Sequence, residues 1–148
     1  ANLFVDYKGI DHRMLGWMTY KYGITGFLYW GVDVWASNTA SIDTYEKANY
    51  SNWNPNSFGT VMGDGYLLYP GEGNNPVASM RLALLRDGIE DYDLFKVAES
   101  LSSKSDKVKS LLNINSKLIK NLTEYNQDGN ALLAHREKLL KAMEAANK

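Results

Sequence analysis

The first third of the chain alternates between short apolar runs and one amphipathic segment. The run Leu3–Val5 is followed by Asp11, which offers an N-cap for a helix over about residues 12–22. Gly23 is a natural stop for that helix, and residues 26–32 then form a stretch that is apolar on both faces of a strand. Strands of this kind are typical of a buried parallel sheet. The order strand, helix, strand therefore predicts an α/β architecture.

A long polar and aromatic stretch over residues 34–63 follows this strand, and loops of that length usually carry function. The turn Gly63–Gly65 then leads into the strand-like residues 66–69. The same turn is also compatible with a hairpin that pairs residues 60–62 with residues 66–68. The pattern leaves both interpretations open.

The second half has the Leu, Lys, Ala and Glu composition and the spacing of packing helices. One helix is expected from about Pro76 to about Leu101. Its interior Gly88 costs about 1 kcal/mol relative to alanine, which indicates a close packing contact at that position. Charged residues crowd around this helix, and we expect them to form a structural ion network that anchors it, with Arg86 and Glu90 as an i,i+4 pair. They are Arg81, Arg86, Asp87, Glu90, Asp91 and Asp93.

The last part of the chain is expected to form a helical hairpin. Ser105 is an N-cap for a helix that continues through Leu122, Asp128–Asn130 turns the chain, and Leu132 and Leu139 mark a final helix. We therefore divide the chain into residues 1–102, an α/β part, and residues 103–148, a hairpin tail.

Composition narrows the classes of function. With 148 residues the chain is too short for a complete (β/α)8 barrel, and together with its beginning at Ala1 this favours a fragment of a larger protein. The net charge of −1 argues against a nucleic-acid partner, and no apolar stretch approaches the ~20 residues of a membrane helix. The chain has no Cys, its two His lack the spacing of a zinc motif, and its glycines form no phosphate loop, so we expect no metal and no cofactor.

Aromatic residues are concentrated in the first 75 positions, where they surround short polar side chains. The C–H faces of a sugar stack on aromatic rings, and its hydroxyls bond to carboxylates and amides, so this mixture indicates carbohydrate. Trp30 and Asp33 lie at the carboxyl end of a predicted strand, where α/β sheets and barrels place their binding loops. The candidate sugar-binding residues are Trp30, Asp33, Trp35, Asn38, Asp64 and Tyr66.

Plainer roles compete with this interpretation. Any single Trp or Tyr is as frequently a core residue beneath a loop as a binding residue. Asp64 stands between two glycines, which favours a turn residue over a catalytic acid. If a strand begins at Tyr66, Asp64 also lies at the wrong end of that strand for catalysis, and only the hairpin interpretation removes this objection.

Four sequence blocks occur in a fixed order along the chain: Gly26–Trp30, Gly63–Gly71, Ser79–Leu82 and Leu85–Tyr92. Together they resemble the C-terminal part of the family 123 glycoside hydrolase-like catalytic domain. The resemblance covers about residues 1–101.

This resemblance implies the last strands and helices of a (β/α)8 barrel and an activity on terminal β-linked N-acetylgalactosamine. In that family an adjacent Asp-Glu pair acts with the acetamido group of the substrate, a substrate-assisted variant of glycoside hydrolysis. The chain contains no Asp-Glu dipeptide, so we expect the pair upstream and no catalytic residue here. The implied partners are a glycan and the upstream part of the polypeptide, and the implied setting is a secreted or periplasmic bacterial enzyme.

Two other classes of protein remain open. The same aromatic residues and the missing acid pair are compatible with a noncatalytic carbohydrate-binding module. The Leu and Lys pattern of residues 103–148 is compatible with a structural domain that docks a partner through a helix pair.

Overall fold

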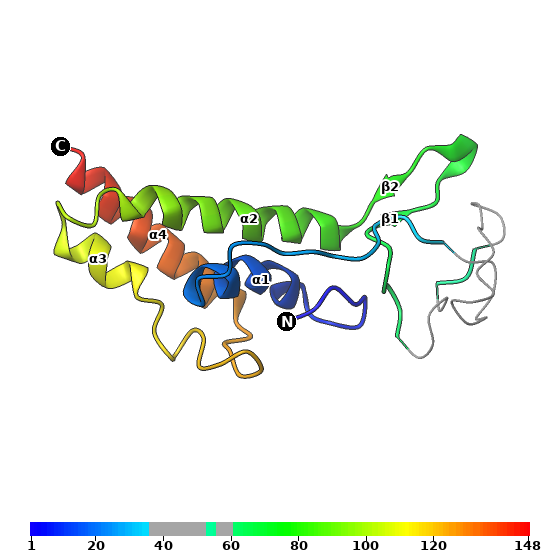
Figure 1. Ribbon diagram of the computed structural model, residues 1–148, viewed down its shortest axis with the longest axis horizontal. Helices are drawn as coiled ribbons and strands as arrows, with labels where there is room; N and C mark the ends of the chain where they lie inside the picture. The colour runs from blue at the N-terminus through cyan, green and yellow to red at the C-terminus, as the bar shows by residue number, and fades with distance from the viewer. Residues whose placement is uncertain (36–52, 56–60) are drawn as a thin grey trace.

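The structure is a computed structural model that describes residues 1–35, 53–55 and 61–148. Over these ranges it is a mixed fold of four α-helices and one small two-stranded sheet (Figure 1). The helices lie together at one end of an elongated molecule, and the sheet lies at the other end, beyond the start of α2. The elements are α1 (Gly9–Lys21), β1 (Leu68–Tyr69), a 3-10 turn (Glu72–Asn74), β2 (Val77–Ala78), α2 (Met80–Glu99), α3 (Asp106–Leu112) and α4 (Gly129–Ala146).

Helix α1 begins earlier than its sequence predicts. The N-cap is Lys8, which gives no side-chain hydrogen bond, and the prediction that Asp11 caps the helix is wrong. Asp11 is instead buried, and its carboxylate accepts hydrogen bonds from the Tyr125 hydroxyl and, at 3.1 Å, from Gln127. The predicted stop at Gly23 is confirmed by its positive φ of 63° just after the helix.

Helices α1 and α2 cross in close contact through two glycines. A Cβ on Gly16 would lie 1.9 Å from the carbonyl oxygen of Gly88, and a Cβ on Gly88 would lie 2.5 Å from that of Arg13. No side chain fits at either position, so the backbones approach directly. The expectation that Gly88 marks a close packing contact is confirmed.

Helix α2 starts later than expected because the preceding residues pair as a strand. Val77–Ala78 form β2 with β1, in the register Leu68 to Ala78 and Tyr69 to Val77, and Ser79 caps the helix by accepting from the Leu82 amide. The expected strand over 66–69 is thus shorter, at Leu68–Tyr69. The alternative hairpin is not formed by its described residues, because Tyr66, which would face Met62, forms a bridge with Asp33 instead, and the Met62 carbonyl accepts from the Val5 amide.

The predicted helix from Ser105 to Leu122 is shorter than expected. Ser105 does cap it, accepting from the Val108 amide, but α3 ends at Leu112. Beyond this point the Asn side chains bond to nearby backbone amides, as when the Asn115 amide oxygen accepts from the Lys117 amide. These local bonds compete with the helical ladder and end it. The tail is therefore two helices, α3 and α4, joined by a long irregular connection.

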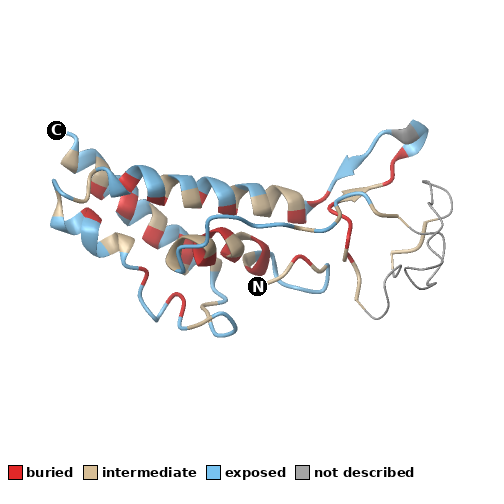
Figure 2. Cartoon of the chain, in the orientation of Figure 1, coloured by how far each residue is buried: buried red, intermediate tan, exposed pale blue. Residues whose placement is uncertain are grey.

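The hydrophobic core lies where all four helices meet. Its members are mostly aliphatic, with Trp17 packed edge-on against Phe95 at a ring distance of 4.9 Å. Figure 2 shows the buried positions on the facing surfaces of the helices. The fully buried core side chains include Met14, Trp17, Phe95, Val108, Ile119, Leu132 and Leu139.

A buried carboxylate ties three of these helices together. Asp91 of α2, only 1% exposed, accepts from the Arg13 guanidinium of α1 at 2.7 and 3.0 Å and from the Trp17 indole at 2.7 Å. Arg136 of α4 adds a bond of 2.8 Å. An ion network that anchors α2 is therefore confirmed, and the Arg86–Glu90 pair, at 3.5 Å, is also present.

The segment over residues 26–32 departs most from its prediction. It is extended but forms no strand, and it runs back along α1 and α2 toward β1 (Figure 1). Its apolar side chains are largely exposed, Leu28 by 86% and Phe27 by 53%. The prediction of a buried strand is thus wrong for the described residues, because an apolar pattern encodes a need for burial without supplying the neighbour that buries it. None of the helices in the described ranges is long and apolar enough to cross a membrane.

Candidate functional site

The clearest functional geometry is the contact between Trp30 and the turn over residues 63–66. The indole Nε1 of Trp30 donates to Oδ1 of Asp64 at 2.9 Å. Gly65 has a φ of +78°, and a Cβ there would lie 2.4 Å from the Trp30 ring, so the absence of a side chain lets the indole lie against the backbone. Trp30 is nevertheless 46% exposed. The result is an aromatic surface held at its edge and partly open to solvent.

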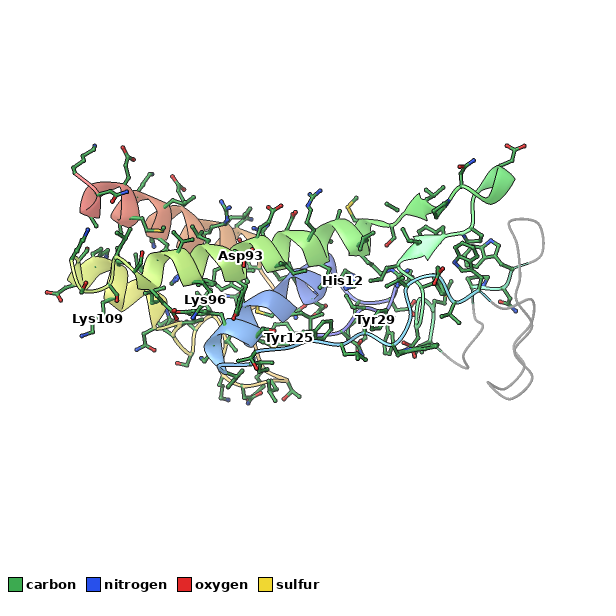
Figure 3. All side chains as sticks on the ribbon, turned by 45° about the horizontal axis from the view of Figure 1, so that its top comes forward. His12, Tyr29, Asp93, Lys96, Lys109 and Tyr125 are labelled. Atoms are coloured by element: carbon green, nitrogen blue, oxygen red, sulfur yellow. The ribbon has the colours of Figure 1, made fainter. Side chains whose placement is uncertain are left out.

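Tyr29 supports this turn from the neighbouring position. Its hydroxyl accepts from the Gly65 amide at 2.8 Å and donates to the Gly63 carbonyl at 3.2 Å. Burial raises the pKa of Tyr29, and the negative charge of Asp64 acts in the same direction. The phenol therefore stays protonated at neutral pH and keeps its donor. Figure 3 shows Tyr29 toward the end of the molecule that carries β1 and β2, away from the end marked by Lys109.

Backbone hydrogen bonds join the two segments of the site. The amide of Val34 donates to the Gly65 carbonyl at 3.0 Å, and the amides of Leu67 and Leu68 both donate to the Val32 carbonyl. Asp33 forms an antiparallel bridge with Tyr66. The structure thus places Asp33, which is exposed, beside the same turn that carries Asp64.

Trp35 and Tyr66 occupy more enclosed positions. The Trp35 indole donates to the Leu68 carbonyl at 2.8 Å and is half-buried. Tyr66 is only 1% exposed, its hydroxyl donates to the Pro55 carbonyl at 2.8 Å, and burial raises its pKa. Trp53 packs edge-on against Tyr66, at 5.5 Å between ring centroids. Asn38, the sixth predicted site residue, lies outside the described residues.

Three cavities lie near the helices. One of about 430 Å³ runs along α2 beside Leu82, Leu85 and Ile89, and a second of about 170 Å³ lies between Phe27 and the α1–α2 pair. The third, of about 210 Å³, is lined by His12 and Arg81 among others. None of these three cavities is lined by Trp30.

The donors needed for a metal ion are not assembled in the described ranges. Within them, no three His, Asp or Glu side chains are placed to hold one. The chemistry available at the site is stacking and hydrogen bonding, with the Trp30 ring, the Asp64 and Asp33 carboxylates and the Trp35 indole as the participating groups.

Comparison with known families identifies the protein family of the chain. The sequence model of the glycoside hydrolase 123 catalytic domain matches residues 1–98. The chain belongs to that family. In this family 123 domain the match takes in α1, the segments around Trp30 and Asp64, the hairpin and nearly all of α2, whereas α3 and α4 follow it. No curated protein matches the chain.

Sequence reasoning overlooked the part that Arg81 plays in this family 123 domain. It grouped Arg81 with the charged residues of α2, but the side chain is 4% exposed and bonds to backbone carbonyls instead. One signal was available: no acidic residue stands three or four positions away from Arg81 in either direction. An arginine at the start of a helix without a local partner is a candidate for long-range contacts.

Proposed function

We propose that this chain forms part of the sugar-binding surface of a glycoside hydrolase that acts on terminal β-linked N-acetylhexosamine, with N-acetylgalactosamine favoured. The observation that carries the proposal is the Trp30 indole, fixed by Asp64 at 2.9 Å and 46% exposed, within a chain of the glycoside hydrolase 123 family. A fixed aromatic ring binds the C–H face of a sugar with little loss of conformational entropy.

The remaining candidates have complementary roles. Asp33 and Asp64 offer carboxylate oxygens for sugar hydroxyls, and Trp35 offers a second ring. Tyr66 is buried, and it supports the segment of Asp33 through the backbone bridge between the two residues. Asn38 remains a candidate on sequence grounds. The catalytic Asp-Glu pair is proposed to lie upstream in the same polypeptide, because this chain contains no such dipeptide.

The barrel is part of the same proposal. Residues 1–102 are proposed to be the C-terminal portion of a (β/α)8 barrel and residues 103–148 a helical tail. The support is the exposure of the apolar side chains of Phe27 and Leu28, together with the apolar cavity on α2 beside Leu82 and Leu85. Surfaces of this kind are buried by further strands and helices in a barrel.

The test uses the longer polypeptide that contains this chain, assayed on aryl β-N-acetylgalactosaminide and on the corresponding glucosaminide. W30A is expected to raise KM about threefold to tenfold, because stacking on an aromatic ring contributes about 0.5–1.5 kcal/mol. Y22A is the matched control, since Tyr22 is 42% exposed at the end of α1, and it is expected to leave KM unchanged.

Two results would contradict the proposal. Absence of turnover on every aryl glycoside would remove the hydrolase activity, and glycan binding by the inactive protein would then favour a noncatalytic carbohydrate-binding module. Turnover with W30A and Y22A indistinguishable from the unmodified protein would remove Trp30 from the site.

A further inference from the structure

Arg81 is a buried cation that has backbone carbonyls for partners. It belongs to the first turn of α2 and is 4% exposed. Its Nη1 donates to the carbonyls of Leu3 and Gly63, and its Nη2 donates to that of Tyr66, each at 2.7 Å. Among the described residues it forms no ion pair, and its Nε has no hydrogen-bond partner. A buried charge held in this way is costly, so its contacts require an explanation.

Two of the three carbonyls belong to the ends of the turn that carries Asp64. Gly63 precedes Asp64 with a φ of +95°, and Tyr66 closes the turn. A Cβ on Gly63 would lie 2.4 Å from Nη1 of Arg81, so the glycine allows the guanidinium to approach this backbone. The guanidinium also lies over the Tyr66 ring, 5.1 Å from its centroid. Arg81 therefore holds both ends of the turn at once.

The geometry of the turn sets the position of Trp30. Oδ1 of Asp64 accepts from the Trp30 indole, and the backbone of Gly65 lies against the Trp30 ring. Arg81 contacts the same four-residue turn at its two ends, through its bonds to the carbonyls of Gly63 and Tyr66. A planar guanidinium presents donors in several fixed directions, whereas a lysine ammonium is a compact charge that does not reproduce this fork.

We infer that Arg81 is a positioning residue for the candidate sugar site. It fixes the turn over residues 63–66 so that Asp64 holds the Trp30 ring in one orientation. The assignment of a sugar to this ring rests on the function proposed above, whereas the coupling of Arg81 to Trp30 is a property of the chain and is measured without a sugar.

The experiment follows the indole N–H signals of the four Trp by nitrogen-15 NMR in the 148-residue chain, assigned with single Trp→Phe variants. R81K and R81Q are compared with D64N, which weakens the Trp30 bond without changing Arg81. Trp17 is the internal reference, because its indole bonds to Asp91 in the core. R86Q is the matched control on the same helix, since the Arg86 side chain is 68% exposed.

R81Q and R81K are expected to move the Trp30 signal toward its position in D64N and to speed its hydrogen exchange about tenfold, with the Trp17 signal unchanged. R86Q is expected to change neither signal. An unchanged Trp30 signal in both Arg81 variants would overturn the inference. Loss of the Trp17 signal in both would also overturn it, because Arg81 would then be required for the fold as a whole.

A second arm separates this inference from the proposed function. In the longer polypeptide, R81K is expected to raise KM for the aryl glycoside by the same factor as D64N, threefold to tenfold, with kcat less affected. If the Trp30 signal moves as expected while KM stays constant in D64N, R81K and W30A, the positioning role stands and the sugar site fails. If W30A raises KM but R81K does not, the positioning role fails and the sugar site stands.

Discussion

The indole nitrogen of Trp17 donates to the carboxylate of Asp91 at 2.7 Å across the α1–α2 contact, although 74 residues separate them in sequence. The same carboxylate also accepts from Arg13 and Arg136. A single buried acid thus accepts hydrogen bonds from side chains of both α1 and α4. Removal of the acid takes the nearest carboxylate away from both Arg13 and Arg136.

Replacement of Asp91 is expected to destabilise the chain strongly. D91N removes the negative charge while keeping the side-chain volume, and it should lower the free energy of unfolding by about 3–5 kcal/mol, because breaking a buried ion pair leaves uncompensated charge. D87N is the matched control one turn earlier on α2, where the carboxylate is 30% exposed and 3.8 Å from Arg13. It should cost less than about 1 kcal/mol. Urea unfolding, monitored by Trp fluorescence, measures the free energy of unfolding of both variants. Equal losses of stability in D91N and D87N would argue against the role of Asp91.

The glycine contact between α1 and α2 predicts that G88A lowers stability, whereas helix propensity alone predicts that it raises stability. Alanine is favoured over glycine in a helix by about 1 kcal/mol, yet G88A places a Cβ 2.5 Å from the Arg13 carbonyl oxygen. We expect a net loss of about 1–3 kcal/mol from the displaced helix. G129A, at the start of α4 with nothing within 4 Å of the added Cβ, should be neutral or stabilising. Thermal unfolding measures the change in stability of the two variants. Stabilisation by G88A would contradict the close contact.

His135 predicts a loss of stability in mild acid. Burial lowers the pKa of His135 below its ordinary value of 6.5, and its ring bonds to the Leu111 carbonyl at 2.9 Å. Between the lowered pKa and 6.5 the unfolded chain binds more protons than the folded chain, so stability rises with pH there and is complete above about 6.5. As the pH falls below 6.5, this contribution is lost.

The check is a comparison of the free energy of unfolding from pH 7.5 to 5 in the unmodified chain and in H135Q, whose amide can still donate to Leu111. The difference between the two curves isolates His135 from the other titrating groups. We expect the difference to change in the interval below 6.5, in favour of the variant as the pH falls. Parallel curves would show that the ring does not titrate differently in the two states.

The proposed barrel predicts that one apolar residue behaves differently in two contexts. Leu28 is 86% exposed, so L28S should change the stability of the 148-residue chain by less than about 0.5 kcal/mol. In the longer polypeptide the same change should cost about 2 kcal/mol or more if further strands cover this segment. L133S on α4, 50% exposed and outside the family match, should have little effect in either. Equal, small effects of L28S in both contexts would count against the barrel.

Local signals in the sequence identified several features correctly. Ser105 caps α3, Gly23 follows the end of α1, and Gly88 marks a close contact. Each depends on the backbone conformation or volume of a single residue, which the residue type largely determines. Features that depend on distant partners were not accessible in this way. Arg13 and Arg136 lie 78 and 45 residues from Asp91, and nothing in the local pattern selects them.

The candidate site shows the same division. Trp30 and Asp64 were both selected for their chemistry, and the structure brings them together. The bond of Arg81 to the turn was missed, because charge on a helix indicates ion pairs rather than backbone carbonyls. The buried position of Tyr66 was also missed, because its hydroxyl donates to the carbonyl of Pro55 and nothing in the local pattern selects that partner.

Helix α2 joins the Asp91 network in the core to the Arg81 contacts with the turn over residues 63–66. Arg81 and Asp91 are ten residues apart on it, a separation of about 15 Å along the axis of an uninterrupted helix. The glycine contact and Asp91 fix the rotation of α2 about its axis near the middle of the helix. They therefore also set the direction in which Arg81 points in its first turn. A substitution deep in the four-helix core, far from any ligand, can therefore change the tilt of the Trp30 ring, and screens for altered affinity in this chain should include the α1–α2 crossing.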